Sequence, residues 1–196
     1  GLGDVYKRQL DLGFTSVMFD GSHLPFEQNV EMTKQVVEMA KSTGAAVEAE
    51  IGCVGGSEDG SVDIAMRCTS PDQAKLFSER TGVDCLAIAI GNAHGFYKEA
   101  PQLRFDILEK VRESVDIPLV LHGGTGIPAD MIKTAISLGV AKINVNTECQ
   151  LSFAAATREY IEAGKDQQGK GYDPRKLLAP GFEANKGTVK EKMELF

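Results

Sequence analysis

Short, nearly continuous hydrophobic runs alternate along this chain with longer stretches of helical periodicity. Each run has the length of a buried parallel strand and ends in polar or glycine-rich sequence. The predicted strands are residues 16–20, 46–51, 85–90, 118–122 and 141–146. The segments between and after them gather hydrophobic residues on one helical face; the predicted helices are residues 29–41, a helix starting at 70–71, and residues 105–114, 129–138 and 149–163. This alternation predicts an α/β fold with a parallel sheet.

Five βα units fit either a doubly wound sheet or part of a TIM (β/α)8 barrel. The barrel is favoured because nearly every predicted strand has polar residues at its carboxyl end, where barrel active sites lie. A doubly wound sheet would gather them at one switch point instead. The chain also contains neither G-x-G-x-x-G nor G-x-x-x-x-G-K-[ST], which weakens a nucleotide-binding alternative. We therefore expect about the last five βα units of a barrel, with residues 165–196 forming a surface connection and a closing helix.

Composition narrows the class of protein. The 196 residues carry 21 Lys and Arg against 28 Asp and Glu, a formal net charge of −7, which argues against a nucleic-acid or anionic membrane partner. No hydrophobic run approaches the roughly 18 residues of a transmembrane helix. Four cysteines without a C-x-x-C pair are typical of free thiols in a reducing compartment. A cytoplasmic protein is expected.

Two of the three histidines follow predicted strands in similar contexts. His94 stands in GNAHG and His122 in LHGGTG. In one barrel both imidazoles would point into the same mouth, and imidazole is a good zinc ligand. The alternative is a pair of hydrogen-bonded structural histidines.

Acidic residues supply a second group of candidates. Glu48 and Glu50 alternate on one strand, so both side chains lie on the same side of it, where they need a cation, a donor or a proton. A structural salt bridge is the alternative. Glu58 and Asp59 lie in a glycine-rich loop, either as solvated charges or as a lid that brings an acid/base group to a substrate. Asp20 ends the first predicted strand.

The last two predicted strands are followed by segments suited to a phosphate. Residues 123–126, GGTG, offer unobstructed backbone N–H groups and the Thr125 hydroxyl. Residues 144–147, NVNT, lie where a predicted helix begins, and such amides bind anions. Barrels often hold phosphate at these two loops. Two ordinary tight βα turns are the alternative.

Six motifs in order resemble the class II, zinc-dependent fructose-bisphosphate aldolases, with the tagatose-bisphosphate aldolases as close relatives. They are GFTSVMFDGSHLPF (13–26), EAEIG (48–52), GGSED (55–59), AHG (93–95), LHGGTG (121–126) and KINVNT (142–147). The resemblance implies reversible, zinc-dependent cleavage of fructose 1,6-bisphosphate into dihydroxyacetone phosphate and glyceraldehyde 3-phosphate, a step of glycolysis and gluconeogenesis.

Carried over residue by residue, the resemblance implies that His94 and His122 bind zinc. Asp20 and Glu50 match acidic positions of a second or shifted cation, and Glu58 matches the acid/base. The resemblance also implies a set of substrate-binding positions: Gly95, Gly123, Gly124, Thr125, Asn144, Val145, Asn146 and Thr147. Asn144 would in addition act in catalysis by hydrogen-bonding the oxyanion. A homodimer or homotetramer is implied as well.

The start of the chain departs from the family. Residues 1–9 do not resemble it, so we expect a non-native leader over 1–9 and the C-terminal part of a single barrel domain over 10–196. The family's third zinc histidine and catalytic aspartate would then lie upstream, and this chain alone would be inactive.

Several alternatives remain open at this stage. One is a tagatose-1,6-bisphosphate aldolase, and another is a non-catalytic phosphosugar-binding remnant. A Schiff-base aldolase is disfavoured, because the lysine on a predicted strand, Lys142, is expected early in that strand, toward the opposite end of the barrel.

Overall fold

The computed structural model describes residues 2–56, 67–95, 97 and 100–196 of the chain. Five parallel strands form one sheet in the order β1-β2-β4-β6-β7. Their bounds are β1 Ser16–Phe19, β2 Ala46–Ile51, β4 Cys85–Ile88, β6 Leu119–Leu121 and β7 Val140–Ile143. The strand order follows the chain, so each βα unit lies beside the preceding one, as in a barrel wall.

All five strands were predicted from the hydrophobic runs, but β7 begins and ends earlier than expected. It covers Val140–Ile143 rather than 141–146, so Asn144 and the residues after it belong to the loop. A second, two-stranded parallel pair was not predicted, because its members are only two residues long: β3 Gly55–Gly56 and β5 Ala93–His94. This pair places His94 beside the carboxyl end of the main sheet.

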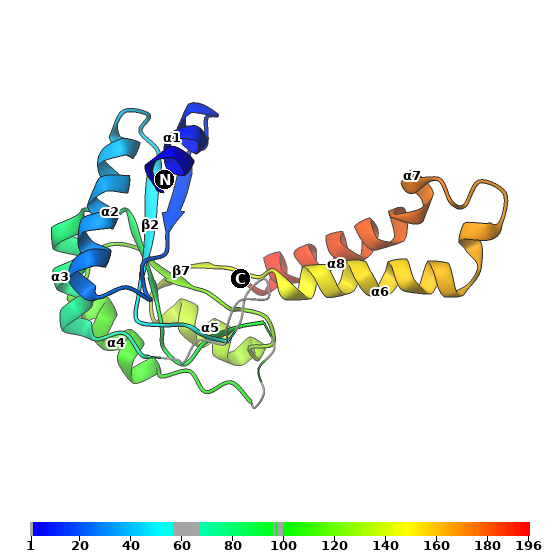
Figure 1. Ribbon diagram of the computed structural model, residues 1–196. Coiled ribbons are helices and arrows are strands. Elements are labelled where there is room, and N and C mark those ends of the chain that lie inside the picture. The colour runs from blue at the N-terminus through cyan, green and yellow to red at the C-terminus, as the bar shows by residue number, and fades with distance from the viewer. Residues whose placement is uncertain (1, 57–66, 96, 98–99) are drawn as a thin grey trace.

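Helices cover the outer face of the sheet, with α2, α3 and α4 side by side along it (Figure 1). The helices of the body are α1 Leu2–Asp11, α2 Phe26–Lys41, α3 Pro71–Thr81, α4 Phe105–Ser114 and α5 Ala129–Ser137. Helix α3 follows the sequence signals closely: Ser70 occupies the N-cap position, Pro71 the first turn, and Gly82 ends the helix at φ 68°. The main core lies between these helices and the strands, centred on Phe77, Leu86, Leu108 and Leu119.

Helix α1 includes most of the segment that the sequence set apart as a leader. Its Tyr6 ring packs edge-on against Phe19 of β1 at 6.2 Å between centroids, and the Tyr6 hydroxyl donates to the Met18 carbonyl at 3.1 Å. Leu10 is buried in the core. The non-native origin of residues 1–9 stays a prediction.

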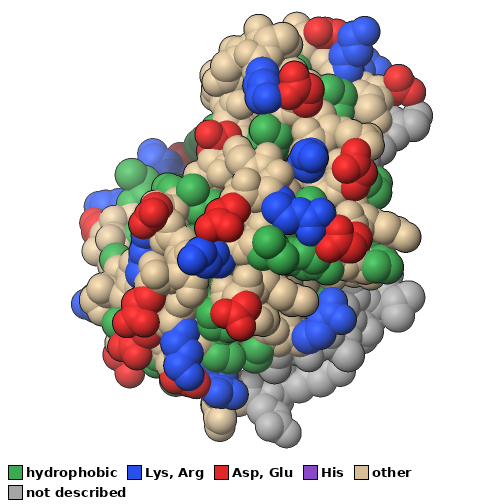
Figure 2. All heavy atoms as spheres, turned by 90° about the vertical axis from the view of Figure 1, so that its left-hand side faces the viewer, with side chains coloured by type: hydrophobic (Ala, Val, Ile, Leu, Met, Phe, Trp, Pro, Cys, Tyr) green, Lys and Arg blue, Asp and Glu red, His purple; other side chains and the backbone are tan. Residues whose placement is uncertain are grey.

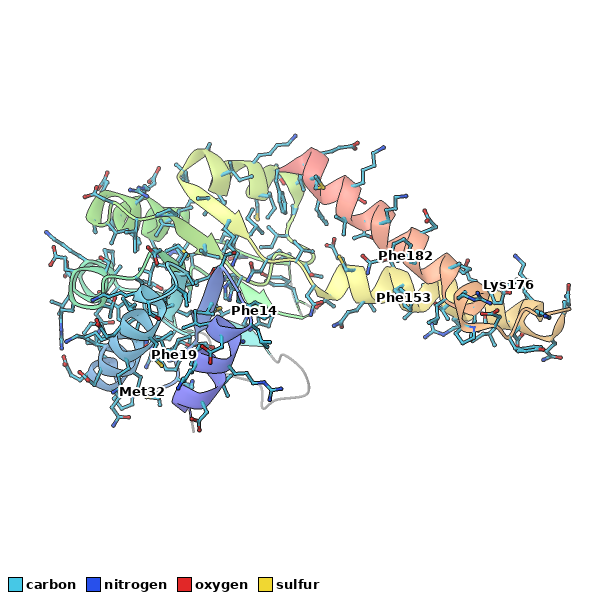
Figure 3. All side chains as sticks on the ribbon, turned by 90° about the horizontal axis from the view of Figure 1, so that it is seen from above. Phe14, Phe19, Met32, Phe153, Lys176 and Phe182 are labelled. Atoms are coloured by element: carbon cyan, nitrogen blue, oxygen red, sulfur yellow. The ribbon has the colours of Figure 1, made fainter. Side chains whose placement is uncertain are left out.

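The C-terminal segment forms an arm that projects from the body (Figure 1). It consists of α6 Thr147–Glu162, the short helices η1 Lys165–Gln167 and α7 Pro174–Leu177, and α8 Ala179–Leu195. Figure 3 shows Phe153 of α6 and Phe182 of α8 along this arm and Lys176 at its far end. The sequence predicted both long helices, but it did not predict that they pair with each other away from the sheet.

The surface carries mixed charge. Figure 2 shows acidic and basic side chains interspersed over the face that it presents, with small hydrophobic areas between them. No helix in the described part of the chain is both long and apolar enough to cross a bilayer. The four cysteines are free thiols.

Candidate active site

A cavity of about 420 Å³ opens at the carboxyl ends of the strands. Its walls come from the ends of β1, β2 and β6, the β5 loop, and the start of α6. The lining residues are Met18, Asp20, Glu50, His94, Gly95, His122, Gly123, Thr125, Asn144, Asn146, Thr147 and Gln150. The cavity therefore combines imidazoles and carboxylates with both glycine- and asparagine-rich loops.

His122 is the most heavily paired side chain of this site. Its Nε2 lies 2.8 Å from Glu48 Oε1 and its Nδ1 lies 3.1 Å from Glu50 Oε2, with 6% of the imidazole and 2% of each carboxylate exposed. Burial alone would lower the pKa of His122, but the contacts with Glu48 and Glu50 outweigh burial and raise it to about 9. The prediction that both glutamates share one side of β2 is confirmed.

Glu48 also binds Lys142, which corrects the expected position of that lysine. Lys142 Nζ lies 2.5 Å from Glu48 Oε2. Because β7 ends at Ile143, Lys142 stands near the carboxyl end of its strand and not toward the opposite end of the barrel. Burial opposes ionisation of Glu48, yet the hydrogen bonds from His122 and Lys142 hold its pKa below the usual value.

Cys85 completes the surroundings of Glu48. The two residues are paired in register between β2 and β4, and the Cys85 thiol donates to Glu48 Oε2 at 3.8 Å. Burial and the neighbouring Glu48 charge raise the pKa of Cys85 to about 11, so the sulfur stays protonated and does not act as a thiolate.

His94 lies opposite His122, as predicted from their matching positions. The two rings are tilted by 42° with 5.9 Å between centroids. Buried Asn92 fixes the intervening loop, since its amide donates to the His122 carbonyl at 3.0 Å. Tyr97 donates its hydroxyl proton to the Gly123 carbonyl at 3.1 Å and accepts from the Ala93 amide at 3.0 Å. No motif or spacing in the sequence pointed to Asn92 or Tyr97.

Gly123 makes this close approach of two loops possible. It adopts φ 64°, and a Cβ there would lie 2.1 Å from the Ala93 carbonyl oxygen. A residue with a side chain would therefore push the His94 loop away.

Two loops form the other wall of the cavity, where α6 begins. Thr125, Asn144, Asn146 and Thr147 all line it, and the N-terminus of a helix favours an anion. Two amides of the glycine loop already donate within the protein, however, and are not available to an anion. The Gly124 N–H donates to the Asn144 carbonyl at 3.0 Å, and the Gly126 N–H donates to Glu148 Oε1 at 2.9 Å.

Most of the predicted site residues are brought together by the fold. Gly124 and Val145 are not among the cavity-lining residues; Gly124 instead ties the two loops together. Glu58 lies outside the described residues. Sequence reasoning missed Met18 and Gln150, which also line the cavity. The helical register of Gln150, one turn after Asn146, was the signal that could have found it.

The imidazole and carboxylate groups that line the cavity are of the types that bind zinc. Glu50 Oε2 is buried and, within the described part of the chain, receives no aligned hydrogen bond, although His122 Nδ1 lies 3.1 Å away. Glu50 Oε2 and His122 Nδ1 could therefore both bind a cation, and the His94 ring lies opposite His122. Among the described residues, no three His, Cys, Asp or Glu side chains are grouped closely enough to hold a metal. These residues thus fit part of a zinc site.

The sequence and fold are similar to those of known aldolases. The family described as "Fructose-bisphosphate aldolase class-II" matches residues 3–196. The chain is 53% identical over 190 residues to the fructose-bisphosphate aldolase of Geobacillus stearothermophilus, covering 97% of this chain and 65% of that protein. It is 52% identical over 189 residues to a probable fructose-bisphosphate aldolase of Bacillus subtilis, covering 96% of this chain and 65% of that protein.

Solved structures agree with the sequence comparison. The YdjI aldolase of Escherichia coli K12 superposes with a TM-score of 0.82 at 39% identity, over 98% of this chain and 65% of that one. A putative fructose-1,6-biphosphate aldolase of Coccidioides immitis superposes with a TM-score of 0.86 at 32% identity, over 98% and 67%.

The fold and cavity thus define a segment of a (β/α)8 barrel whose strand ends carry imidazoles, carboxylates and loops rich in glycine and asparagine. The chain belongs to the class II fructose-bisphosphate aldolase family. It spans about 65% of the length of the curated relatives that it matches, and its βα units are part of the TIM barrel of that family.

Proposed function

We propose that the complete gene product containing this chain is a zinc-dependent aldolase of the cytoplasm. It reversibly cleaves fructose 1,6-bisphosphate into dihydroxyacetone phosphate and glyceraldehyde 3-phosphate, in glycolysis and gluconeogenesis. One observation carries the proposal: a single cavity joins the His94–His122 pair and Glu50 to the loops that contain Thr125 and Asn144. A ketose phosphate needs both halves, because its carbonyl and its phosphate lie within one small molecule.

His94 and His122 would hold the zinc ion, with Asp20 and Glu50 near a second or shifted cation. Bound there, zinc supplies Lewis-acid stabilisation of the negative charge that develops on the substrate carbonyl oxygen. Asn144 lines the same cavity, and we assign its amide to hydrogen-bond that oxygen. Glu58 is proposed to move the proton at the ketose phosphate.

The phosphate of the ketose is proposed to lie against the glycine loop and the start of α6. Thr125 and Thr147 line this part of the cavity and offer hydroxyl donors. Gly95 and Gly123 leave the wall free of side chains, and Asn146 precedes the helix. Gly124 and Val145 contribute by shaping the loop, because the Gly124 amide already binds the Asn144 carbonyl.

The complete gene product is also proposed to form a homodimer or homotetramer. Helix α8 and its C-cap residue carry several exposed hydrophobic side chains at helical spacing, which are Phe182, Val189, Met193 and Phe196. The arm stands away from the body (Figure 1), so this stripe is well placed to meet a second copy.

An enzyme assay of the complete gene product tests the proposed reaction. Cleavage of fructose 1,6-bisphosphate is followed with a coupled dehydrogenase, with tagatose 1,6-bisphosphate compared in parallel. We expect turnover that EDTA abolishes, that zinc restores, and that borohydride does not trap. Asn144→Ala should lower kcat about 100- to 1,000-fold, whereas Gln35→Ala, at an exposed position on α2, should not change it.

Other outcomes would contradict the proposal in different ways. Faster cleavage of tagatose 1,6-bisphosphate than of fructose 1,6-bisphosphate would identify the tagatose ester as the preferred substrate. Borohydride inactivation in the presence of substrate would indicate a Schiff-base lysine. Binding of dihydroxyacetone phosphate without any turnover would leave a phosphosugar-binding protein.

A further inference from the structure

Glu48 is a buried carboxylate that does not line the cavity, yet it contacts the imidazole that does. Only 2% of its side chain is exposed. Its Oε1 lies 2.8 Å from His122 Nε2, and its Oε2 accepts from Lys142 Nζ at 2.5 Å and from the Cys85 thiol at 3.8 Å. Both oxygens are therefore engaged, by Cys85 of β4, by Lys142 of β7 and by His122, which directly follows β6.

The two nitrogens of His122 lie in unequal surroundings. Nε2 has a short hydrogen-bond contact with Glu48, whereas Nδ1 faces Glu50 Oε2, which receives no aligned hydrogen bond in the described part of the chain. A neutral imidazole has one N–H donor and one acceptor nitrogen. Because the ionised Glu48 can only accept, the proton of a neutral His122 belongs on Nε2, and the lone pair belongs on Nδ1.

We propose that Glu48 and Lys142 are positioning residues that hold His122 with Nε2 protonated and Nδ1 presented to the cation. This inference rests on the proposed zinc-dependent function and adds residues from outside the cavity. Lys142 acts through Glu48: its ammonium balances the buried carboxylate and fixes the Oε2 atom, so that Oε1 stays aimed at the ring.

The location of the pair across the sheet supports this role, because β4 and β6 lie between β2 and β7. Glu48 is paired in register with Met18 of β1 and Cys85 of β4, and Lys142 of β7 is paired with Val120 of β6. The ion pair thus joins β2 to β7 through the same carboxylate that contacts the His122 ring. Hydrogen-bonded partners of this kind orient histidine ligands, and their loss typically weakens metal binding about 10- to 100-fold.

Zinc affinity and the tautomer of His122 test the proposal in the complete gene product. Zinc binding is measured by competition with a chromophoric chelator, and ring ¹⁵N–¹H correlation spectra identify the protonated nitrogen in the zinc-loaded protein. Glu48→Gln and Lys142→Met should weaken zinc binding about 10-fold or more. Lys142→Arg keeps the charge and should restore affinity to within about threefold of the original.

Asp84→Asn is the matched control. Asp84 is a carboxylate that directly precedes β4, and its Oδ2 accepts from the Val47 amide of β2 at 2.7 Å rather than from His122. Its replacement should lower thermal stability and leave zinc affinity unchanged. If Glu48→Gln does not fold, the Lys142 variants and the spectra of the unaltered protein still decide the question.

The outcomes separate this inference from the proposed function. A protein that binds zinc with His122 Nε2 as the ligand and Nδ1 protonated overturns the positioning role alone. So does unchanged zinc affinity in Glu48→Gln and Lys142→Met. A protein that binds no zinc at all overturns both the function and the inference.

Discussion

Three buried titratable groups set the electrostatics of the site at the scale of single residues. Glu48 and Glu50 flank His122, and their side chains are almost wholly removed from water. A buried charge is tolerated only when it is paired. In the absence of metal, a protonated His122 pairs with both carboxylates. When a cation is bound to Nδ1, the same two negative charges would stabilise the cation instead.

Metal-free protein should lose stability as the pH rises from neutral to alkaline. The pKa of folded His122 is about 9, against an ordinary value of 6.5, so the folded state binds the proton more tightly. The resulting stability is fully present below pH 6.5 and is lost as the pH rises to about 9. It amounts to on the order of 3 kcal/mol.

Urea unfolding in the presence of EDTA, between pH 6 and pH 9.5, measures this loss. The variant His122→Asn removes the titrating ring, so its stability should vary much less over that range. A free energy of unfolding that stays constant or rises in the original protein would contradict the pairing.

Gly123→Ala should destabilise the protein and displace the His94 loop. Its φ of 64° and the 2.1 Å approach of a Cβ to the Ala93 oxygen predict a loss of about 2 kcal/mol or more. Gly82→Ala is the matched control, because Gly82 has φ 68° with nothing within 4 Å of its Cβ position and should lose only about 1 kcal/mol. Equal losses in denaturant unfolding would show that the loop contact does not matter.

Part of the site could be predicted from residue types alone. His94 and His122 each stand after a strand and before glycine, and alternation along β2 placed Glu48 and Glu50 together. The partnership of Lys142 with Glu48 could not be predicted, because it joins positions 94 residues apart in sequence. It also depends on where β7 ends, and strand ends are the least certain feature of a hydrophobic pattern.

At the scale of elements, hydrophobic periodicity predicted the strands and most helices but not the arm. Helix α6 packs on α8 and has no fully buried residue. Its apolar positions alone do not distinguish packing on the sheet from packing on another helix. Its partner α8 contains Gly181 and Gly187, which lowered the helical signal there. The pairing of α6 with α8 is a tertiary contact, and the local sequence pattern of either helix does not predict it.

Two glycines of α8 should respond oppositely to the same substitution. A Cβ on Gly181 would lie 2.5 Å from Thr157 Oγ1 and 2.9 Å from Phe153 Cδ2, so Gly181→Ala should separate α6 from α8 and cost about 1–3 kcal/mol. At Gly187 nothing lies within 4 Å, and alanine should stabilise the helix by about 0.5–1 kcal/mol. Hydrogen exchange of the α6 and α8 amides, together with thermal unfolding, distinguishes the two. Stabilisation by both substitutions would mean that the helices are not in close contact.

At the scale of the whole molecule, the arm is expected to mediate self-association. Light scattering of the complete gene product should show a dimer or tetramer. The double variant Phe182→Glu, Met193→Glu should shift it toward monomer, whereas Leu76→Glu, at an exposed position on α3 of the body, should not. An oligomer that is unaffected by the arm substitutions would place the interface elsewhere.

The sheet and the arm together frame one cavity, which we propose binds zinc and a ketose phosphate. Strand order places the ends of β1, β2 and β6 around it, while the β5 loop and the start of α6 close two sides. Each of these elements is ordinary for a parallel α/β protein. Their combination at one mouth is what the proposed zinc-dependent function requires.

Anomalous X-ray scattering from crystals of the zinc-loaded complete gene product, measured on both sides of the zinc absorption edge, would locate the metal. We expect a single strong zinc peak in the cavity, within bonding distance of a ring nitrogen of His94 and of His122 Nδ1. A cavity without a zinc peak, or a peak bound to neither histidine, would contradict this expectation.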